Sequence, residues 1–272
     1  MNLEFEKSPK LEKWRRWMEV IHNEVGGLIR DTSMFWEVQD IIRANPRIQK
    51  PSTFYHYLGR TYLSHALAGL RRQIKPNKDS ISLIGLLDDI TENPEQLSRS
   101  YYRSLCSHPD GPDICQIESE GRTTLAEAGI TDSSQLKKLI NADNFAQYAD
   151  ASGKHVCPQM IKADRDKLKS AVEACEEFAD KRIAHWDKDE PEDVPTFGEL
   201  DECIKLLDKT YVKYHVLFYA EWMDTLMPTY QYNWKTVFLE PWLAAVAGSA
   251  KRLIHISEDF DGELPEFREY MQ

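Results

Sequence analysis

The stretch "STFYHYLGRTYLSHALAGLRRQI", from Ser52 to Ile74, decides the fold class. Its apolar side chains recur at steps of three and four residues, which is the period of one buried face of an α-helix. Ser52 or Thr53 is suited to cap the start of this helix. Arg71 and Arg72 stand in the last turn, where cations interact favourably with the helix dipole. The stretch therefore predicts one amphipathic helix of about six turns.

Two helices are expected before this stretch, over residues 9–30 and 33–44. Leu11 opens an apolar stripe in the first of them, and Gly26-Gly27 weakens its end. After the stretch, we expect a helix opened by Asp79 or Ser80 and a short one beyond Asn93-Pro94, because proline suits the first turn of a helix.

Residues 106–157 are rich in turn-forming residues and have a weaker period, so we interpret them as a loop-rich insertion. From Pro158 the helical period returns and runs toward His185. Thr196 and Glu199 then form a capping box, which predicts a helix that continues to about Met227. This last helix is expected to be the longest, and the aromatic tail after it to pack on the bundle.

The composition supports an all-α fold in a single domain of 272 residues. Hydrophobic residues make up 42% of the chain and turn-separated β-branched runs are nearly absent. The five cysteines are odd in number, the first residues are polar, and no stretch has the length and apolar character of a membrane span. We expect a cytoplasmic protein with reduced thiols that does not bind membranes.

The formal net charge is −11, which is opposite to that of a non-specific nucleic-acid binder. An RNA or nucleotide site would have to be a local basic pocket. The sequence "EFADKRIAHWDKDEPED" (177–193) offers one candidate, since Lys181 and Arg182 lie one helical turn before His185. A histidine that titrates near neutrality beside a cation can move a proton while the cation neutralises a phosphate.

Three ordered blocks carry a family resemblance: "LRRQIKPNKDSISLIGLLDDI" (70–90), "DKRIAHWDKD" (180–189) and "NWKTVFLEPW" (233–242). Together they resemble the HEPN superfamily, and in particular its abortive-infection, AbiU-like branch. The resemblance implies an all-α, HEPN-like helical bundle that pairs as a homodimer with the motif histidines near the dimer cleft. It also implies metal-independent RNA cleavage or nucleotide binding in a phage-defence or toxin–antitoxin system, with a cognate antitoxin or another partner protein.

The chain departs from the family pattern, which has an arginine a short spacer before the histidine. Phe178, Ala179 and Asp180 occupy the matching positions. His185 therefore carries over directly, and the substitute cation is Arg182 from the same face, or Arg71 and Arg72 from another helix. The residues assigned to catalysis are His185 and Arg182, and those assigned to ligand binding are Lys181, Asp180, Asp187, Arg71 and Arg72.

Other constellations point to structure more than to chemistry. Cysteines and histidines at 106–115 and 155–157 lack standard zinc spacing, and the acidic run 187–193 lacks the glycine of a calcium loop. Aromatic residues from Tyr211 to Trp222 have core spacing, although aromatic rings can also stack bases. No metal or cofactor is predicted.

Three hypotheses remain open for the motif. It forms a ribonuclease site, a catalytically inactive module that binds a nucleotide, an RNA or a protein, or a purely structural helix end. In the last case His185 is a capping residue that interacts with the helix dipole.

Overall fold

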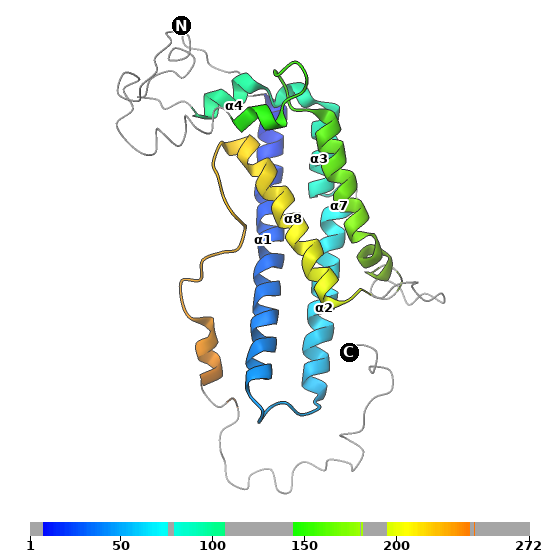
Figure 1. Cartoon of the computed structure of the whole chain (residues 1–272), viewed down its shortest axis with the longest axis vertical. Coiled ribbons are helices and arrows are strands. Elements are labelled where there is room, and N and C mark those ends of the chain that lie inside the picture. The colour runs from blue at the N-terminus through cyan, green and yellow to red at the C-terminus, as the bar shows by residue number, and fades with distance from the viewer. Residues whose placement is uncertain are drawn as a thin grey trace, which may run out of the picture. The chain divides into compact units, whose positions relative to one another are not determined.

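The computed structural model describes residues 8–75, 79–106, 144–179, 181, 195–239 and 242. Over these residues the fold is all-α, as the sequence predicts, and none of them belongs to a β-strand. Two isolated β-bridges are present, between Ser98 and His155 and between Ala149 and Val156. The described helices include none with the length and apolar character needed to cross a bilayer. The elements are α1 (Pro9–Ala44), α2 (Thr53–Ile74), α3 (Leu83–Glu92), η1 (Pro94–Gln96), α4 (Arg99–Cys106), η2 (Asn144–Tyr148), α7 (Pro158–Phe178), α8 (Phe197–Tyr219) and η4 (Trp234–Leu239) (Figure 1).

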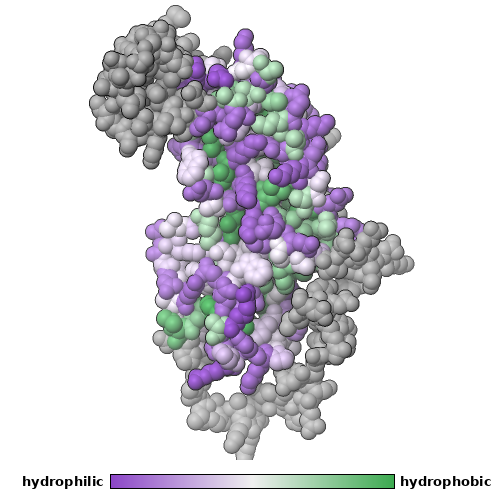
Figure 2. All heavy atoms as spheres, viewed as in Figure 1, coloured by the Kyte–Doolittle hydropathy of each residue, from purple (hydrophilic) through white to green (hydrophobic). Residues whose placement is uncertain are grey.

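These elements fall into two compact units. The first comprises the described parts of Met1–Thr32 and Leu63–Met227, and the second comprises those of Ser33–Tyr62 and Pro228–Gln272. Both α1 and α2 contribute residues to each unit. Hydrophilic side chains dominate the described surface seen in Figure 2, with apolar side chains between them in small areas.

Helix α1 is continuous, which corrects the prediction of two helices broken near Gly26-Gly27. Both glycines keep negative φ values, so neither adopts the left-handed conformation of a helix end. Buried side chains continue on both sides of the glycine pair, from Val25 to Leu28. A Cβ at Gly26 would lie 3.5 Å from the carbonyl oxygen of Leu226, so the glycine lets that segment approach the helix. Packing thus outweighs the cost of glycine in a helix, about 0.5–1 kcal/mol each.

Helix α2 has the bounds that its period predicts, and it packs closely on α1. A Cβ at Gly69 would come within 2.9 Å of Cγ and Cδ1 of Leu28, whose side chain is buried. The next helix starts later than expected, because Ser82 and not Asp79 or Ser80 caps it. The Ser82 hydroxyl accepts a hydrogen bond from the N–H of Gly85 at 3.1 Å.

The residues after Asn93 also differ in detail from the prediction. Pro94 begins the short 3₁₀ turn η1, and α4 starts separately at Arg99. Residues 107–143 of the predicted insertion lie outside the described residues. Its described last part contains η2 and a turn at Gly153, whose φ is 70°. No helix longer than η2 occurs in that part before α7 begins.

Helix α8 starts at the predicted capping box but ends earlier than predicted, at Tyr219 instead of near Met227. Ala220 adopts a left-handed conformation, with φ 51°, and its N–H bonds to the carbonyl of Val216. The carbonyl of Phe218 accepts hydrogen bonds from Arg15 at 3.1 Å and from Tyr101 at 3.2 Å. These contacts satisfy groups that a helix end leaves without a partner. The longest described helix is therefore α1, with 36 residues, and not α8, with 23.

After α8 the chain turns back along the same helix. Asp208, on α8, accepts hydrogen bonds from the Thr225 hydroxyl at 2.6 Å and from the Leu226 N–H at 2.8 Å. Leu226 is buried, as expected, whereas Trp222 is 71% exposed and does not continue the α8 core.

In the second unit, the aromatic tail stacks mainly on itself. Trp234 lies 6.0 Å from Phe238, and Phe238 lies 5.6 Å from Trp242, measured between ring centroids. Much of this surface is exposed, and Trp242 is 64% accessible. The sequence predicts that the aromatic tail is packed, but these rings leave much of their surface exposed. Lys235 of the tail forms an ion pair with Glu37 of α1.

Candidate functional site

Most of the predicted site lies outside the described residues. This applies to His185, Arg182, Asp180 and Asp187, so their geometry is not described. Lys181 is described, and its ammonium group pairs with the Glu177 carboxylate at 2.7 Å. This i,i+4 pair lies where α7 ends.

Two of the three positions at which the HEPN pattern would have an arginine are buried at the end of α7. Phe178 is 4% exposed and Ala179 is 2% exposed, so both belong to the core. An arginine at either position would have to bury its charge, which is costly without a paired acid. Neither position therefore provides a cation at the surface.

Arg71 and Arg72 lie in the last turn of α2, as predicted. The guanidinium of Arg72 pairs with Glu24 of α1 at 2.8 Å, so its charge is already partly neutralised. Arg71 is half-buried.

The helices that flank the motif segment are anchored to each other. The carboxylate of Asp164 on α7 accepts hydrogen bonds from Lys213 at 2.5 Å and from Tyr214 at 2.9 Å, both on α8. On its other side α7 is tied to α3, because Arg165 pairs with Asp88 at 2.6 Å. The segment that carries His185 thus connects two helices whose positions are set by polar contacts.

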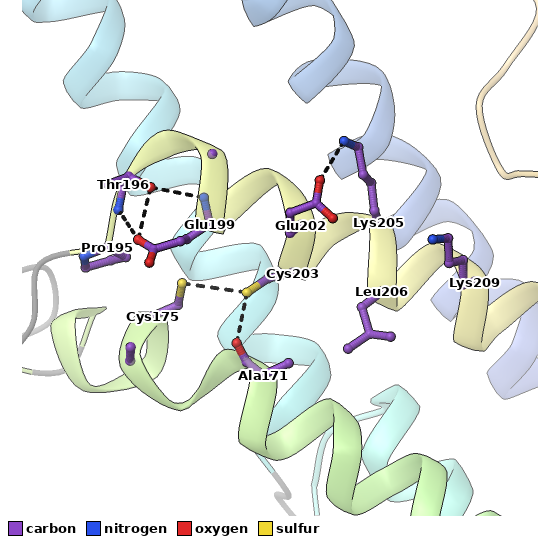
Figure 3. A pocket seen from close by; sticks show the side chains of 12 residues that line it. Ala171, Cys175, Pro195, Thr196, Glu199, Glu202, Cys203, Lys205, Leu206 and Lys209 are labelled. Carbon is purple, nitrogen blue, oxygen red and sulfur yellow. Dashed lines mark hydrogen bonds and ion pairs between the residues drawn. The ribbon is translucent and has the colours of Figure 1, made fainter. Parts of the chain in front are cut away.

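A cavity of about 580 Å³ lies between α7 and the start of α8 (Figure 3). Its polar rim contains acids and bases in equal number, so it has no excess of positive charge for a phosphate. The N-terminus of α8 is also occupied, since Glu199 and Thr196 complete their capping box there. The lining residues are Ala171, Ala174, Cys175, Pro195, Thr196, Gly198, Glu199, Glu202, Cys203, Lys205, Leu206 and Lys209.

Two thiols meet in the wall of this cavity. The sulfur atoms of Cys175 on α7 and Cys203 on α8 are 3.9 Å apart, and the Cys203 thiol lies 3.1 Å from the Ala171 carbonyl oxygen (Figure 3). The hydrogen bond to Cys203 and burial raise the pKa of Cys175. The hydrogen bond from Cys175 lowers the pKa of Cys203, against burial and the nearby acids.

Cys175 and Cys203 lie on the apolar stripes of their helices, which predicts core positions, and both are buried; the stripes do not reveal that the two residues are in contact. A signal was present, because both residues lie near the connection between two consecutive helices. In an antiparallel pair, residues at similar distances from the connection face each other. Cys175 is three residues before the end of α7, and Cys203 is six residues after the start of α8.

The spacing of the aromatic residues predicts core positions, which is confirmed for three of them and wrong for Trp222, which is 71% exposed. Tyr211, Tyr214 and Phe218 are at most 1% exposed, so they are core residues and not a platform for bases. Among the described residues no group of three or more histidine, cysteine or acidic side chains is arranged to hold a metal ion. The acidic run 187–193 lies outside the described residues.

Comparison of the chain with known proteins adds no assignment. No protein-family model, no curated protein and no solved structure matches it. Arguments about function therefore rest on the residues and the geometry described above.

Proposed function

We propose that this chain is a HEPN-like helical protein of a phage-defence or toxin–antitoxin system. Its functional segment is the connection between α7 and α8. In this proposal His185 is the acid/base group of metal-independent RNA cleavage, and Arg182, with Lys181, binds the phosphate. The observation that supports the proposal is that α7 and α8, which precede and follow the segment with His185, are joined to each other by the hydrogen bonds of Lys213 and Tyr214 to Asp164.

The chemistry that the proposal requires is limited. RNA cleavage by this route needs a group that removes the proton of the attacking hydroxyl and a cation that stabilises the charge on the phosphate. A histidine with a pKa near neutrality suits the first task, and an arginine suits the second because it stays protonated and can bind two phosphate oxygens. Pairing of two copies would bring two such segments to one cleft.

One observation favours a second candidate function, a binding module without catalysis. Phe178 and Ala179 are buried, so the family's usual arginine has no equivalent at either position. In addition, the Lys181 charge is partly neutralised by Glu177. A site with a histidine but a weakened set of cations would bind RNA, a nucleotide or a cognate protein and not cleave it.

The test is expression of the wild type and His185→Ala in a bacterial host at matched soluble levels, with His155→Ala as the control. His155 lies in the turn before α7 and has no role in the proposal. Cleavage predicts growth arrest with fragmented RNA in the wild type and in His155→Ala, and relief in His185→Ala.

Binding without cleavage predicts intact RNA in all three strains. It also predicts RNA, nucleotide or protein that co-purifies with the wild type and is lost with His185→Ala. Identical growth, identical RNA and identical co-purifying material in all three strains would contradict both functions.

A further inference from the structure

We propose that Cys175 and Cys203 form a redox-active dithiol site, in which a hydroperoxide oxidises Cys203 and Cys175 then closes a disulfide that joins α7 to α8. The inference goes beyond the proposed function and holds whether or not His185 is catalytic. It rests on the contact between the two sulfur atoms, on the cavity beside them, and on their position in two different helices.

The sulfur atoms are already close enough for bond formation with local movement. They are 3.9 Å apart, and a disulfide bond is about 2.05 Å long. The two sulfur atoms face each other (Figure 3), and the helices that carry them, α7 and α8, run in opposite directions (Figure 1). A change of side-chain torsion in one or both cysteines is the movement required.

Access comes from the cavity and not from the outer surface. Cys175 is 3% exposed and Cys203 is 5% exposed, so bulky reagents meet little of either sulfur. Both nevertheless line a cavity of about 580 Å³, which has room for a small peroxide molecule. Small neighbours, Ala171, Ala174 and Gly198, leave that space open.

The hydrogen bonds give the two thiols different roles. The Cys203 thiol donates to the carbonyl oxygen of Ala171, a bond that is lost on ionisation, and its sulfur can accept the S–H of Cys175, a contact that favours a thiolate on Cys203. The thiolate is the nucleophilic form of cysteine, so Cys203 attacks first and Cys175 resolves the product. Burial, Glu199 and Glu202 oppose ionisation of Cys203.

The reaction balances in two steps. The Cys203 thiolate attacks one oxygen of the peroxide, the O–O bond breaks, and the products are a sulfenic acid and an alcohol, or water from hydrogen peroxide. The Cys175 sulfur then attacks the sulfenic sulfur, and water leaves as the S–S bond forms. Two thiols are oxidised and one peroxide is reduced, and a dithiol reductant reverses the change.

The disulfide would join residues on either side of the α7–α8 connection, which contains His185, because Cys175 precedes that connection and Cys203 follows it. Any effect of oxidation on His185 chemistry rests on the proposed function. Formation of the disulfide does not rest on the proposed function, and it can be detected without an activity assay.

The test uses the full-length reduced protein treated with hydrogen peroxide. Free thiols are then counted after denaturation, and unreduced peptides are mapped by mass spectrometry. We expect the thiol count to fall from five to three, with one linked peptide pair that contains Cys175 and Cys203 and disappears with dithiothreitol. Cys157→Ser is the matched control, because Cys157 is partly exposed and lies outside the cavity, and it should leave the linkage unchanged.

The variants separate the two roles. Cys175→Ser should stop at a sulfenic acid on Cys203 that dimedone labels, and Cys203→Ser should give no linked pair. The wild-type result does not depend on whether these variants fold. The proposal is overturned if the folded wild type gives no such pair, if other cysteines form the linkage, or if dimedone labels Cys175 in Cys203→Ser as strongly as Cys203 in Cys175→Ser.

Discussion

Replacement of Gly27 by alanine tests the continuity of α1. Gly27 lies inside the helix with a negative φ, and the nearest atom to an added Cβ is Nη2 of Arg30, at 4.0 Å. Alanine there gains helix propensity and meets no obstacle. We expect the free energy of unfolding to rise by about 0.5–1 kcal/mol.

Gly69→Ala is the matched comparison, because it makes the same chemical change in α2. Its Cβ would come within 2.9 Å of three atoms of the Leu28 side chain, which is only 2% exposed. Overpacking of a core costs about 1–3 kcal/mol, which exceeds the gain in helix propensity of about 1 kcal/mol. We expect a net loss of up to about 2 kcal/mol. In a Leu28→Ala background the same substitution should become stabilising.

The assay is urea unfolding followed by far-UV circular dichroism. A loss of stability in Gly27→Ala would refute the reasoning, because it would mean that the glycine pair ends a helix in the left-handed conformation. Equal effects of Gly27→Ala and Gly69→Ala would refute the close packing of α2 on Leu28.

Four further predictions follow from named contacts. Burial raises the pKa of Asp89, but hydrogen bonds from Trp14, Lys10 and Lys13 lower it to about 2 overall. The contribution of Asp89 to the free energy of unfolding is therefore present above its unfolded pKa of 3.8 and is lost as the pH falls toward 2. Asp89→Asn should remove about 1–2 kcal/mol at neutral pH and make the free energy of unfolding less dependent on pH below about 4. Thr196→Ala should cost about 1 kcal/mol in urea unfolding and increase amide exchange at the start of α8, while unchanged exchange would contradict the capping box. Ala220→Gly should stabilise the protein by about 0.5–1 kcal/mol, because glycine adopts a φ of 51° without strain, and a loss would place the end of α8 elsewhere. A disulfide between Cys175 and Cys203, 28 positions apart, should add about 3.5 kcal/mol to the unfolding free energy, measured against the same sample after reduction.

The sequence predicts helices well where local signals and packing agree. α2 has the predicted bounds because its apolar stripe, its capping residues and its final arginines all favour the same helix. The capping box at Thr196 is also local, since both partners lie within one turn.

Prediction fails where distant residues decide the outcome. Gly26 is tolerated inside α1 because Leu226 packs against it, and α8 ends because Arg15 and Tyr101 bind the carbonyl of Phe218. No pattern within either helix shows these partners. A glycine pair is a usual sign of a helix end, and the segment after Tyr219 has no glycine or proline before Pro228.

The same distinction applies to the candidate site. The motif around His185 is visible in the sequence, and the structure adds that Phe178 and Ala179 beside it are buried. The contact between Cys175 and Cys203 depends on the register of two helices that 18 residues separate, so the period of each helix alone does not reveal it.

The return of the chain to Asp208 after α8 has a mechanical consequence. Tension applied to the chain beyond Met227, through a tag or a bound partner, would reach α8 first through the hydrogen bonds of Leu226 and Thr225. Asp208 lies about three turns before the end of the helix at Tyr219. Pulling would therefore load α8 in its middle, and its last turns, which hold Phe218 against Arg15 and Tyr101, would stay unloaded until those bonds broke.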